Sequence, residues 1–350
     1  AAERWPVPGG ATASGARAPW RGSAGLALGQ TAGPGSGDAF PDLPAKTLGR
    51  LLAQPGALGD RHIAPALESA LAKVGDMDGK DCVRVLRALV EQGGRAQLDQ
   101  TALRRLGARL TERLEDISVG DMADLAEALA EASAPVAPVF ARISVAFGLR
   151  AAGASAPQLA KVAVAFSRAR LADRRLFPRL AQSALKQVHA FGEPELPSFL
   201  AAFAAVGICH EPLLTAASKV VAARANRLSA LDLALIAYAY AQFFLVFPVV
   251  VSMLERRLPG CAHELSPARL AELCVSCARL EVRPAGLLAT FAEGLDLGGL
   301  GAPLFGQAAK SAARLGLACT PRLEAQLGSG CLARLEGPDA GTEWLLDAVE

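Results

Sequence analysis

At 350 residues the chain is longer than one ordinary globular core, so two domains or a repeat array are expected. Ala, Leu and Arg dominate and aromatic residues make up only 5% of the chain, a composition that is typical of helices and not of sheets. The formal net charge is +2, and 20% of residues are charged. A net charge this small does not attract nucleic acid or an anionic membrane to the chain as a whole. Any contact with nucleic acid must therefore use a local cluster of basic residues.

Residues 1–42 are the first distinct segment. Gly, Ala and Pro dominate it, with Trp5 and Trp20 as large anchors. Such a composition cannot bury a core of its own, so we expect an extended arm that is ordered by a partner. The sequence begins at Ala1 and not at Met, which suggests either a removed targeting peptide, and so an organelle, or an incomplete start.

A repeat of 37 residues follows, and it decides the expected fold. A small residue followed by a larger one recurs at this spacing as Ala128-Leu129, Ala165-Phe166, Ala202-Phe203, Ala239-Tyr240 and Ser276-Cys277. Apolar residues also stand four and seven positions before the second member of each pair. Positions i, i+3 and i+7 form one face of a helix, so each repeat is predicted to begin with an amphipathic helix.

A second helix keeps the same period. Val139-Phe140 recurs as Leu176-Phe177, Leu213-Leu214, Val250-Val251 and Leu287-Leu288. The spacing is 40 residues before this region and 35 after it, as is usual for the ends of an array. The sequence therefore predicts an all-α fold, an α-solenoid of about eight helix-pair repeats over residues 43–336, with a C-terminal tail at 337–350.

The repeat pattern is L-x-x-L-A-x-A-[FY], followed by a second helix that opens on an apolar residue and Phe. Its clearest copy is Leu159 to Phe166 with Leu176-Phe177, and it resembles the heptatricopeptide repeats of organellar RNA-binding proteins. Those repeats are known beside a RAP domain, in the family that includes the FAST-kinase-like proteins. Only Trp344-Leu345-Leu346 remains as an apolar segment after the last repeat, so neither a RAP domain nor its activity is expected.

The resemblance implies a mitochondrial address, with the plastid as the alternative. It also implies either transcript binding or membership of an organellar ribosome. A nearly neutral array with an ordered arm suits a subunit held by many contacts better than a free RNA binder.

The cysteine and histidine residues do not form the pattern of a metal site or a catalytic site. Seven cysteines without a dense framework favour a reduced compartment. Cys274 and Cys277 form a C-x-x-C, but they occupy positions that hold Ala, Leu, Phe or Tyr in other repeats, so buried, reduced and metal-free thiols are predicted. The histidines stand far apart, at His62, His189, His210 and His263. We therefore expect no catalytic residues, no cofactor and no enzyme activity.

The apolar run from Leu233 to Leu254 is long enough to suggest a membrane span. It contains both helices of one repeat in register, so a buried central repeat and no transmembrane segment are predicted. Exposed Phe243, Phe244 or Phe247 near the turn would mark a protein contact.

Basic residues concentrate between Lys161 and Lys186, where seven Lys and Arg face one acid, Asp173. Arg105, Arg142 and Arg179 share one position on three successive second helices. Stacked helices would set them as a ladder with steps of roughly 10 Å, which suits a phosphate backbone, although a solvated outer face is the alternative. The candidate RNA-binding residues are therefore Arg105, Arg142, Arg179, Lys161, Arg168, Arg170, Arg174 and Arg175.

Three functions fit these observations. The first is a non-catalytic subunit of an organellar ribonucleoprotein, the mitochondrial ribosome above all, that binds ribosomal RNA and neighbouring proteins. The second is a purely structural subunit of an organellar protein or membrane complex. The third is a free organellar transcript-binding factor. No small-molecule substrate is expected in any of them.

Overall fold

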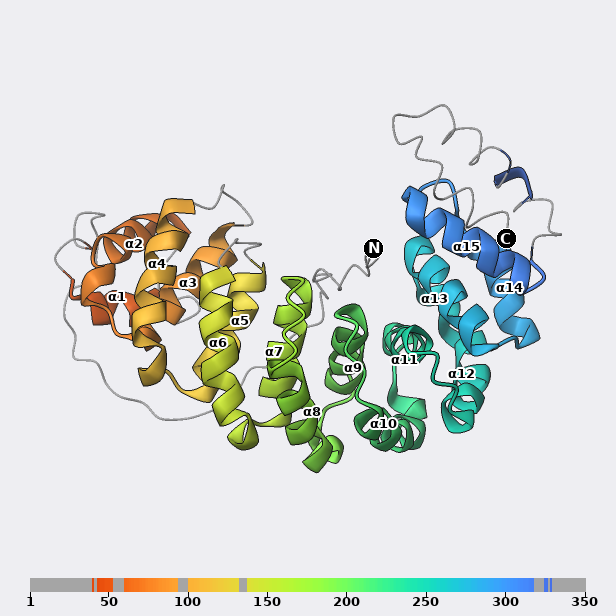
Figure 1. Ribbon diagram of the computed structural model, residues 1–350. Helices are drawn as coiled ribbons and strands as arrows, with labels where there is room; N and C mark the ends of the chain where they lie inside the picture. The colour runs from red at the N-terminus through yellow and green to blue at the C-terminus, as the bar shows by residue number, and fades with distance from the viewer. Residues whose placement is uncertain are drawn as a thin grey trace. The chain divides into compact units, whose positions relative to one another are not determined.

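The structure, a computed structural model, describes residues 40, 43–52, 60–93, 100–131, 137–317, 324–326 and 328. Within these ranges every regular element is a helix and there is no strand (Figure 1). Fifteen α-helices and six short 3-10 helices are followed by helical residues at 324–326 and 328. The all-helical class predicted from composition is confirmed. The predicted tail and all of the predicted arm except Phe40 lie outside the described residues. Phe40 itself is buried, and its ring centroid lies 6.1 Å from that of His62.

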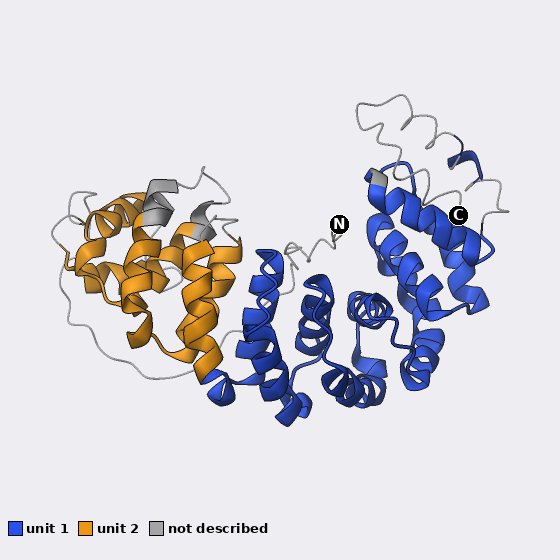
Figure 2. Cartoon of the chain, viewed as in Figure 1, with its two compact units in different colours: residues 1–5, 150–350 blue, residues 6–149 orange. Residues whose placement is uncertain are grey.

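The chain divides into two compact units, coloured separately in Figure 2. The N-terminal unit comprises residues 6–149, and the C-terminal unit comprises residues 1–5 and 150–350. The boundary falls at Arg150, the last residue of a helix. The sequence predicts one continuous array across this boundary, and that continuity stays a prediction.

The N-terminal unit is built from helix pairs. The first helix α1 packs on its partner α2 and on α3, and α3 packs in turn on α4 and α5. Each pair therefore touches the next one through its first helix. The helices are α1 Ala45–Leu52, α2 Asp60–Ala72, α3 Gly79–Gly93, α4 Gln100–Arg113, α5 Val119–Glu131 and α6 Ala137–Arg150.

The C-terminal unit is also built from helix pairs, and its helices pack in two rows. The first helices pack in sequence order as α7, α9, α11, α13 and α15, and the second helices as α8, α10, α12 and α14. Sequence neighbours are thus spatial neighbours. The bounds are α7 Ala156–Arg168, α8 Leu176–Lys186, α9 Glu195–Ala205, α10 Glu211–Ala223, α11 Ala230–Gln242, α12 Pro248–Cys261, α13 Pro267–Leu280, α14 Ala285–Gly294 and α15 Ala302–Arg314.

The buried faces have the predicted register. The small residues of the first helices are at most 4% exposed, and a small side chain lets neighbouring helix axes approach closely. They are Ala128, Ala165, Ala202, Ala239 and Ser276. The larger residues that follow them are buried too, including Phe166, Phe203 and Tyr240. The hydroxyl of Tyr240 donates a hydrogen bond of 2.7 Å to the carbonyl oxygen of Leu214, which satisfies its buried polar atom.

Recurring caps mark where the first helices begin. The backbone amide of Ser155 donates to Gln158 Oε1 at 3.0 Å, and that of Ser229 donates to Asp232 Oδ2 at 3.0 Å. One repeat after Ser155, the amide of Gly192 donates in the same way to Glu195 Oε2 at 2.7 Å. Gln158 and Asp232 stand at the third helical position, and Glu195 is the first residue of α9. In all three cases a side chain near the helix start satisfies a backbone donor that the helix leaves open.

A Schellman motif ends each first helix of the C-terminal unit. In each motif an apolar residue donates its backbone amide to a carbonyl oxygen of the helix's last turn, as in the 3.1 Å bond from Leu245 to the carbonyl oxygen of Tyr240. The residue just before this apolar residue has a positive φ. Such left-handed residues are 37 residues apart in four successive motifs, and the last one follows after 35 residues. The left-handed residues are Arg170, Gly207, Phe244, Glu281 and Gly316.

Polar side chains at the ends of second helices link one repeat to the preceding one. Gln187 Nε2 donates to the carbonyl oxygen of Ala154 at 2.8 Å. Arg224, 37 residues later, donates to the carbonyl oxygen of Phe191 at 2.6 Å and to that of His189 at 2.7 Å. We call these bonds the inter-repeat latches. They tie the short 3-10 helices η3 Ala151–Gly153 and η4 Val188–Ala190 to the following pair.

The apolar run from Leu233 to Leu254 is divided between two helices, α11 and α12, as the repeat register predicts. Both helices contribute buried residues to the C-terminal unit. Among the described helices, none combines the length and the hydropathy that a membrane crossing requires.

Candidate nucleic-acid interface

The turn between α7 and α8 is the most basic part of the C-terminal unit. Its path is set by the left-handed Arg170 and by Asp173, whose Oδ1 accepts hydrogen bonds from the amides of Arg175 at 2.8 Å and Leu176 at 3.0 Å. The only acid of the segment 161–186 is therefore engaged in holding the start of α8. Its carboxylate orients the turn.

Three arginines project from this turn. Arg170, Arg174 and Arg175 are exposed. None of their guanidinium groups forms an ion pair or a hydrogen bond with another residue that the structure describes. We call these three residues the basic turn. Each guanidinium carries five N–H donors, in the fork geometry that fits phosphate oxygens.

Helix α8 extends the basic surface beyond the turn. Arg175, Arg179, Gln182 and Lys186 are exposed at spacings of four, three and four residues, so they lie along one face of the helix. The opposite face holds Phe177, which is fully buried. Arg179 thus belongs to the solvent face of α8, as the sequence predicts.

Two other predicted residues are more deeply placed. Lys161, in the middle of α7, and Arg168, in its last turn, are half-buried, and both interact with other residues of the chain. They contribute positive charge to the segment but are less available to a ligand than the basic turn.

Several other arginines of the C-terminal unit are engaged within the protein. Arg224 forms an inter-repeat latch, and Arg257 Nε donates to the carbonyl oxygen of Ala225 at 3.1 Å. Arg269 pairs with Glu272 at 2.8 Å. Exposed Arg283 and Arg314 also have no partner among the described residues. The basic turn is therefore distinguished by the gathering of three such arginines on one short turn.

Arg105 and Arg142, the first two members of the predicted ladder, are exposed on α4 and α6. Leu106 and Phe140 beside them are buried, so the two arginines take no part in helix packing. Both belong to the N-terminal unit, whereas Arg179 belongs to the C-terminal unit. A ladder formed by all three therefore stays a prediction.

The C-x-x-C cysteines have the predicted core positions. Cys274 and Cys277 are fully buried and unbonded. Burial raises the pKa of the Cys274 thiol to about 12, and burial together with the neighbouring Cys274 raises the pKa of Cys277 well above its ordinary value. Because metals bind thiolates, these protonated thiols are poor ligands. In the described parts of the chain, no three His, Cys, Asp or Glu residues group together as a metal site would need.

The helix pairs and the basic turn define an all-helical protein of repeat-like architecture with a localised cationic surface. No family model matches the sequence, and the search of curated proteins found no similar chain.

Sequence reasoning did not recognise the recurring Schellman motif. Its signal was present, because Gly207 and Gly316 stand in register with Arg170, Phe244 and Glu281, and each is followed by an apolar residue. Glycine at a helix C-terminus is the usual sign of a left-handed residue. Only two of these five positions hold glycine, which hid the pattern.

Proposed function

We propose that the chain is a non-catalytic helical-repeat scaffold that binds RNA. In this proposal about eight helix pairs form an α-solenoid, and the chain is a subunit of an organellar ribonucleoprotein, foremost the mitochondrial ribosome. The resemblance to heptatricopeptide repeats supports the organellar and ribosomal setting, with the plastid as the alternative address. A free transcript-binding factor would use the same surface.

One observation carries the proposal. The basic turn presents three exposed guanidinium groups without partners among the described residues, and the segment's only carboxylate is engaged in orienting that turn. Positioned cations on one short turn suit the closely spaced charges of a nucleic-acid backbone. Phosphate contacts of this kind fix the position of RNA without reading its sequence.

A replacement of the three arginines tests RNA binding. The variant Arg170→Gln, Arg174→Gln, Arg175→Gln should bind single-stranded RNA more weakly, irrespective of sequence. The slope of log affinity against log salt should flatten by about 0.7 for each phosphate that the variant no longer binds. Fluorescence anisotropy over a salt series measures both quantities, and circular dichroism checks the helix content.

The matched control removes three other exposed arginines from the same unit, Arg227, Arg256 and Arg314, again as Gln. It loses the same formal charge but leaves the basic turn intact. Equal losses of RNA affinity in the two variants would show that net charge alone causes the effect. Unchanged RNA binding in the variant of the basic turn would contradict the proposal.

A second candidate function, a purely structural subunit that binds proteins, is favoured by another surface. On α6, Val145 is 59% exposed and Leu149 is 71% exposed, one helical turn apart and beside Arg142. Neighbouring exposed aliphatic residues are typical of protein contacts. If Val145→Ser with Leu149→Ser blocks incorporation into a complex while RNA affinity is unchanged, this candidate takes precedence.

A further inference from the structure

Phe244 occupies a backbone position that favours glycine. Its φ is +54°, and it is the left-handed residue of the Schellman motif between α11 and α12. Gly207 and Gly316 fill the same position in other repeats. A bulky aromatic residue at positive φ is an outlier that costs stability, and such strain concentrates at functional positions.

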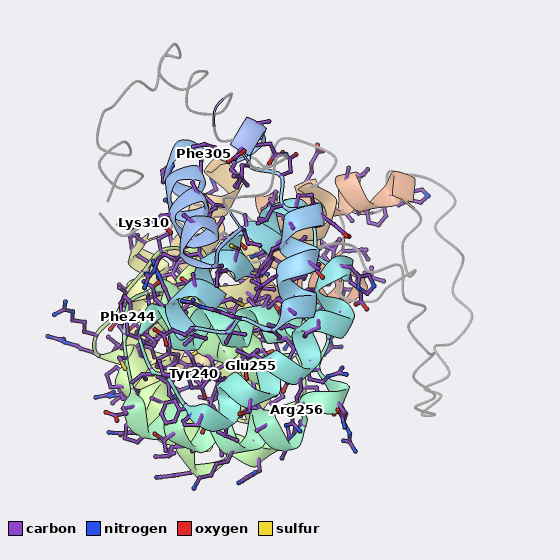
Figure 3. The ribbon with its side chains drawn as sticks, turned by 90° about the vertical axis from the view of Figure 1, so that its right-hand side faces the viewer. Tyr240, Phe244, Glu255, Arg256, Phe305 and Lys310 are labelled. Carbon is purple, nitrogen blue, oxygen red and sulfur yellow. The ribbon has the colours of Figure 1, made fainter. Side chains whose placement is uncertain are left out.

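The ring of Phe244 is not needed for the core. The residue is 71% exposed, whereas its neighbour Phe247 packs against Tyr240 with ring centroids 5.6 Å apart at an interplanar angle of 81°. Leu245 supplies the apolar residue that the motif requires. Figure 3 shows Phe244 at the margin of the fold, with Tyr240 of the same helix pair further in.

Arg279 of α13 contacts one face of the Phe244 ring. Its guanidinium carbon lies 5.7 Å from the ring centroid, within cation–π range. Gln242 Oε1 accepts a hydrogen bond of 3.0 Å from Arg279 Nη1 and holds the guanidinium there. The exposed remainder of the ring forms, with Arg279, a flat cationic platform.

The platform shares an edge of the C-terminal unit with the basic turn. Arg170, Gly207 and Phe244 are equivalent left-handed residues in three successive repeats whose first helices pack in that order. At roughly 10 Å between neighbouring helices, the first and third are about 20 Å apart. Gly207 stands between them, and an added side-chain carbon there would meet nothing within 4 Å.

We propose that Phe244 is a stacking platform for an unpaired base of the RNA strand whose phosphates bind the basic turn. This inference rests on the proposed function and adds to it that the RNA is single-stranded at this edge. Aromatic stacking combined with a cationic path is the usual device for single strands. Exposed Glu281 holds the equivalent position in the next repeat, and its charge repels phosphate, so the strand runs from Phe244 towards Arg170.

The probe is a fluorescein-labelled single-stranded oligoadenylate of about 12 nucleotides, within the usual site size of such surfaces. A second probe has the same ribose-phosphate backbone but abasic nucleotides. The full-length chain carrying Phe244→Gly should bind oligoadenylate on the order of ten-fold more weakly than the native chain, because one base no longer stacks. Its salt slope should not change, because the arginines that bind phosphate are intact.

The abasic probe separates stacking from backbone binding. The native chain should bind it more weakly than oligoadenylate, and Phe244→Gly should have no further effect. Phe244→Trp should keep or increase the affinity for oligoadenylate. If Phe244→Gly weakens binding to both probes by the same factor, or if it binds oligoadenylate as tightly as the native chain, the inference is wrong.

Stability controls accompany these measurements. Because glycine suits a positive φ, Phe244→Gly should unfold at the same or a higher temperature than the native chain. Glu281→Gly makes the same backbone change one repeat on and should not weaken RNA binding. Should Phe244→Gly fold poorly, Phe244→Asn takes its place, since Asn tolerates this backbone conformation.

The outcomes also separate this inference from the proposed function. If the native chain binds both probes alike with a normal salt dependence, RNA binding stands and the platform is wrong. If the native chain binds neither, the proposed function fails as well. Loss of a protein partner from Phe244→Gly, with RNA binding unchanged, would assign the platform to protein and overturn the inference.

Discussion

Glu272 is a charged side chain inside the first-helix layer of the C-terminal unit. It is 4% exposed, and Arg269, one turn earlier in α13, donates to its Oε2 at 2.8 Å. Burial raises the pKa of the Glu272 carboxyl above its ordinary value of 4.5, and the charge and hydrogen bond of Arg269 oppose that shift only in part. At neutral pH the ionised form of this buried carboxyl therefore destabilises the fold, because Arg269 compensates only part of the lost hydration.

The raised pKa of Glu272 predicts a pH-dependent stability. The folded chain holds the proton of Glu272 more tightly than the unfolded chain does. The contribution of Glu272 to the free energy of unfolding is therefore greatest below pH 4.5 and is lost as pH rises through the raised pKa. The unfolding free energy of the native chain, minus that of Glu272→Gln, should fall over this window. Urea denaturation at several pH values measures the difference, in which other titrating groups cancel. A difference that is constant or rises with pH would contradict this prediction.

At the scale of the element, the inter-repeat latches couple one helix pair to the next. Gln187 and Arg224 stand at the same position of successive repeats and bond to backbone carbonyls 33 to 35 residues earlier. In the N-terminal unit, Lys73 Nζ donates in the same way to the carbonyl oxygen of Leu43 at 2.6 Å. Without the latches, carbonyl groups at the ends of the short 3-10 helices would have to accept hydrogen bonds from water.

Arg224→Ala should therefore destabilise the array. It removes two hydrogen bonds from a half-buried side chain, which together contribute about 1–3 kcal/mol. Arg227→Ala is the matched control, because its ion pair with Glu193 at 3.3 Å is exposed and exposed pairs contribute less than about 1 kcal/mol. Both free energies come from urea denaturation. Equal losses would show that the latch adds nothing beyond a surface pair.

At the scale of the whole molecule, the proposed function leaves two arrangements to distinguish: the candidate arginines of the two units form one RNA-binding surface or two separate ones. Arg105 and Arg142 lie on the N-terminal unit and Arg179 on the C-terminal unit, all three exposed at one position of the 37-residue repeat. A ladder across the boundary requires the repeat to continue through Arg150 without interruption. RNA binding can report on that continuity.

Replacing Arg105, Arg142 and Arg179 by Gln should weaken RNA binding for every sequence and flatten its salt slope by about 0.7 for each phosphate released from a single strand. The double variant of Arg105 and Arg142 and the single variant of Arg179 assign the loss to each unit. A protein partner must be assayed separately, because an acidic partner would also lose affinity. If affinity and salt slope stay unchanged in the triple variant, these arginines only face solvent, and the structural-subunit alternative gains ground.

The sequence by itself determined the helices, their pairing and their buried faces. Ala165, Phe166 and Cys277 are buried where the period predicts, because helical periodicity is a property of the segment and repeats with it. The exposure of Arg105, Arg142 and Arg179 followed from the same register. Each of these predictions needs only the spacing along one helix.

Only the tertiary structure decided which polar and aromatic residues are available to a ligand. Arg224 and Arg175 look alike in the sequence, yet Arg224 bonds to carbonyls of the preceding repeat and the Arg175 guanidinium meets no described partner. Phe244 is exposed at a strained turn, whereas Phe247, three residues on, packs on Tyr240. These differences depend on where the neighbouring repeat places its carbonyls and rings, and spacing along a single helix carries no record of that placement.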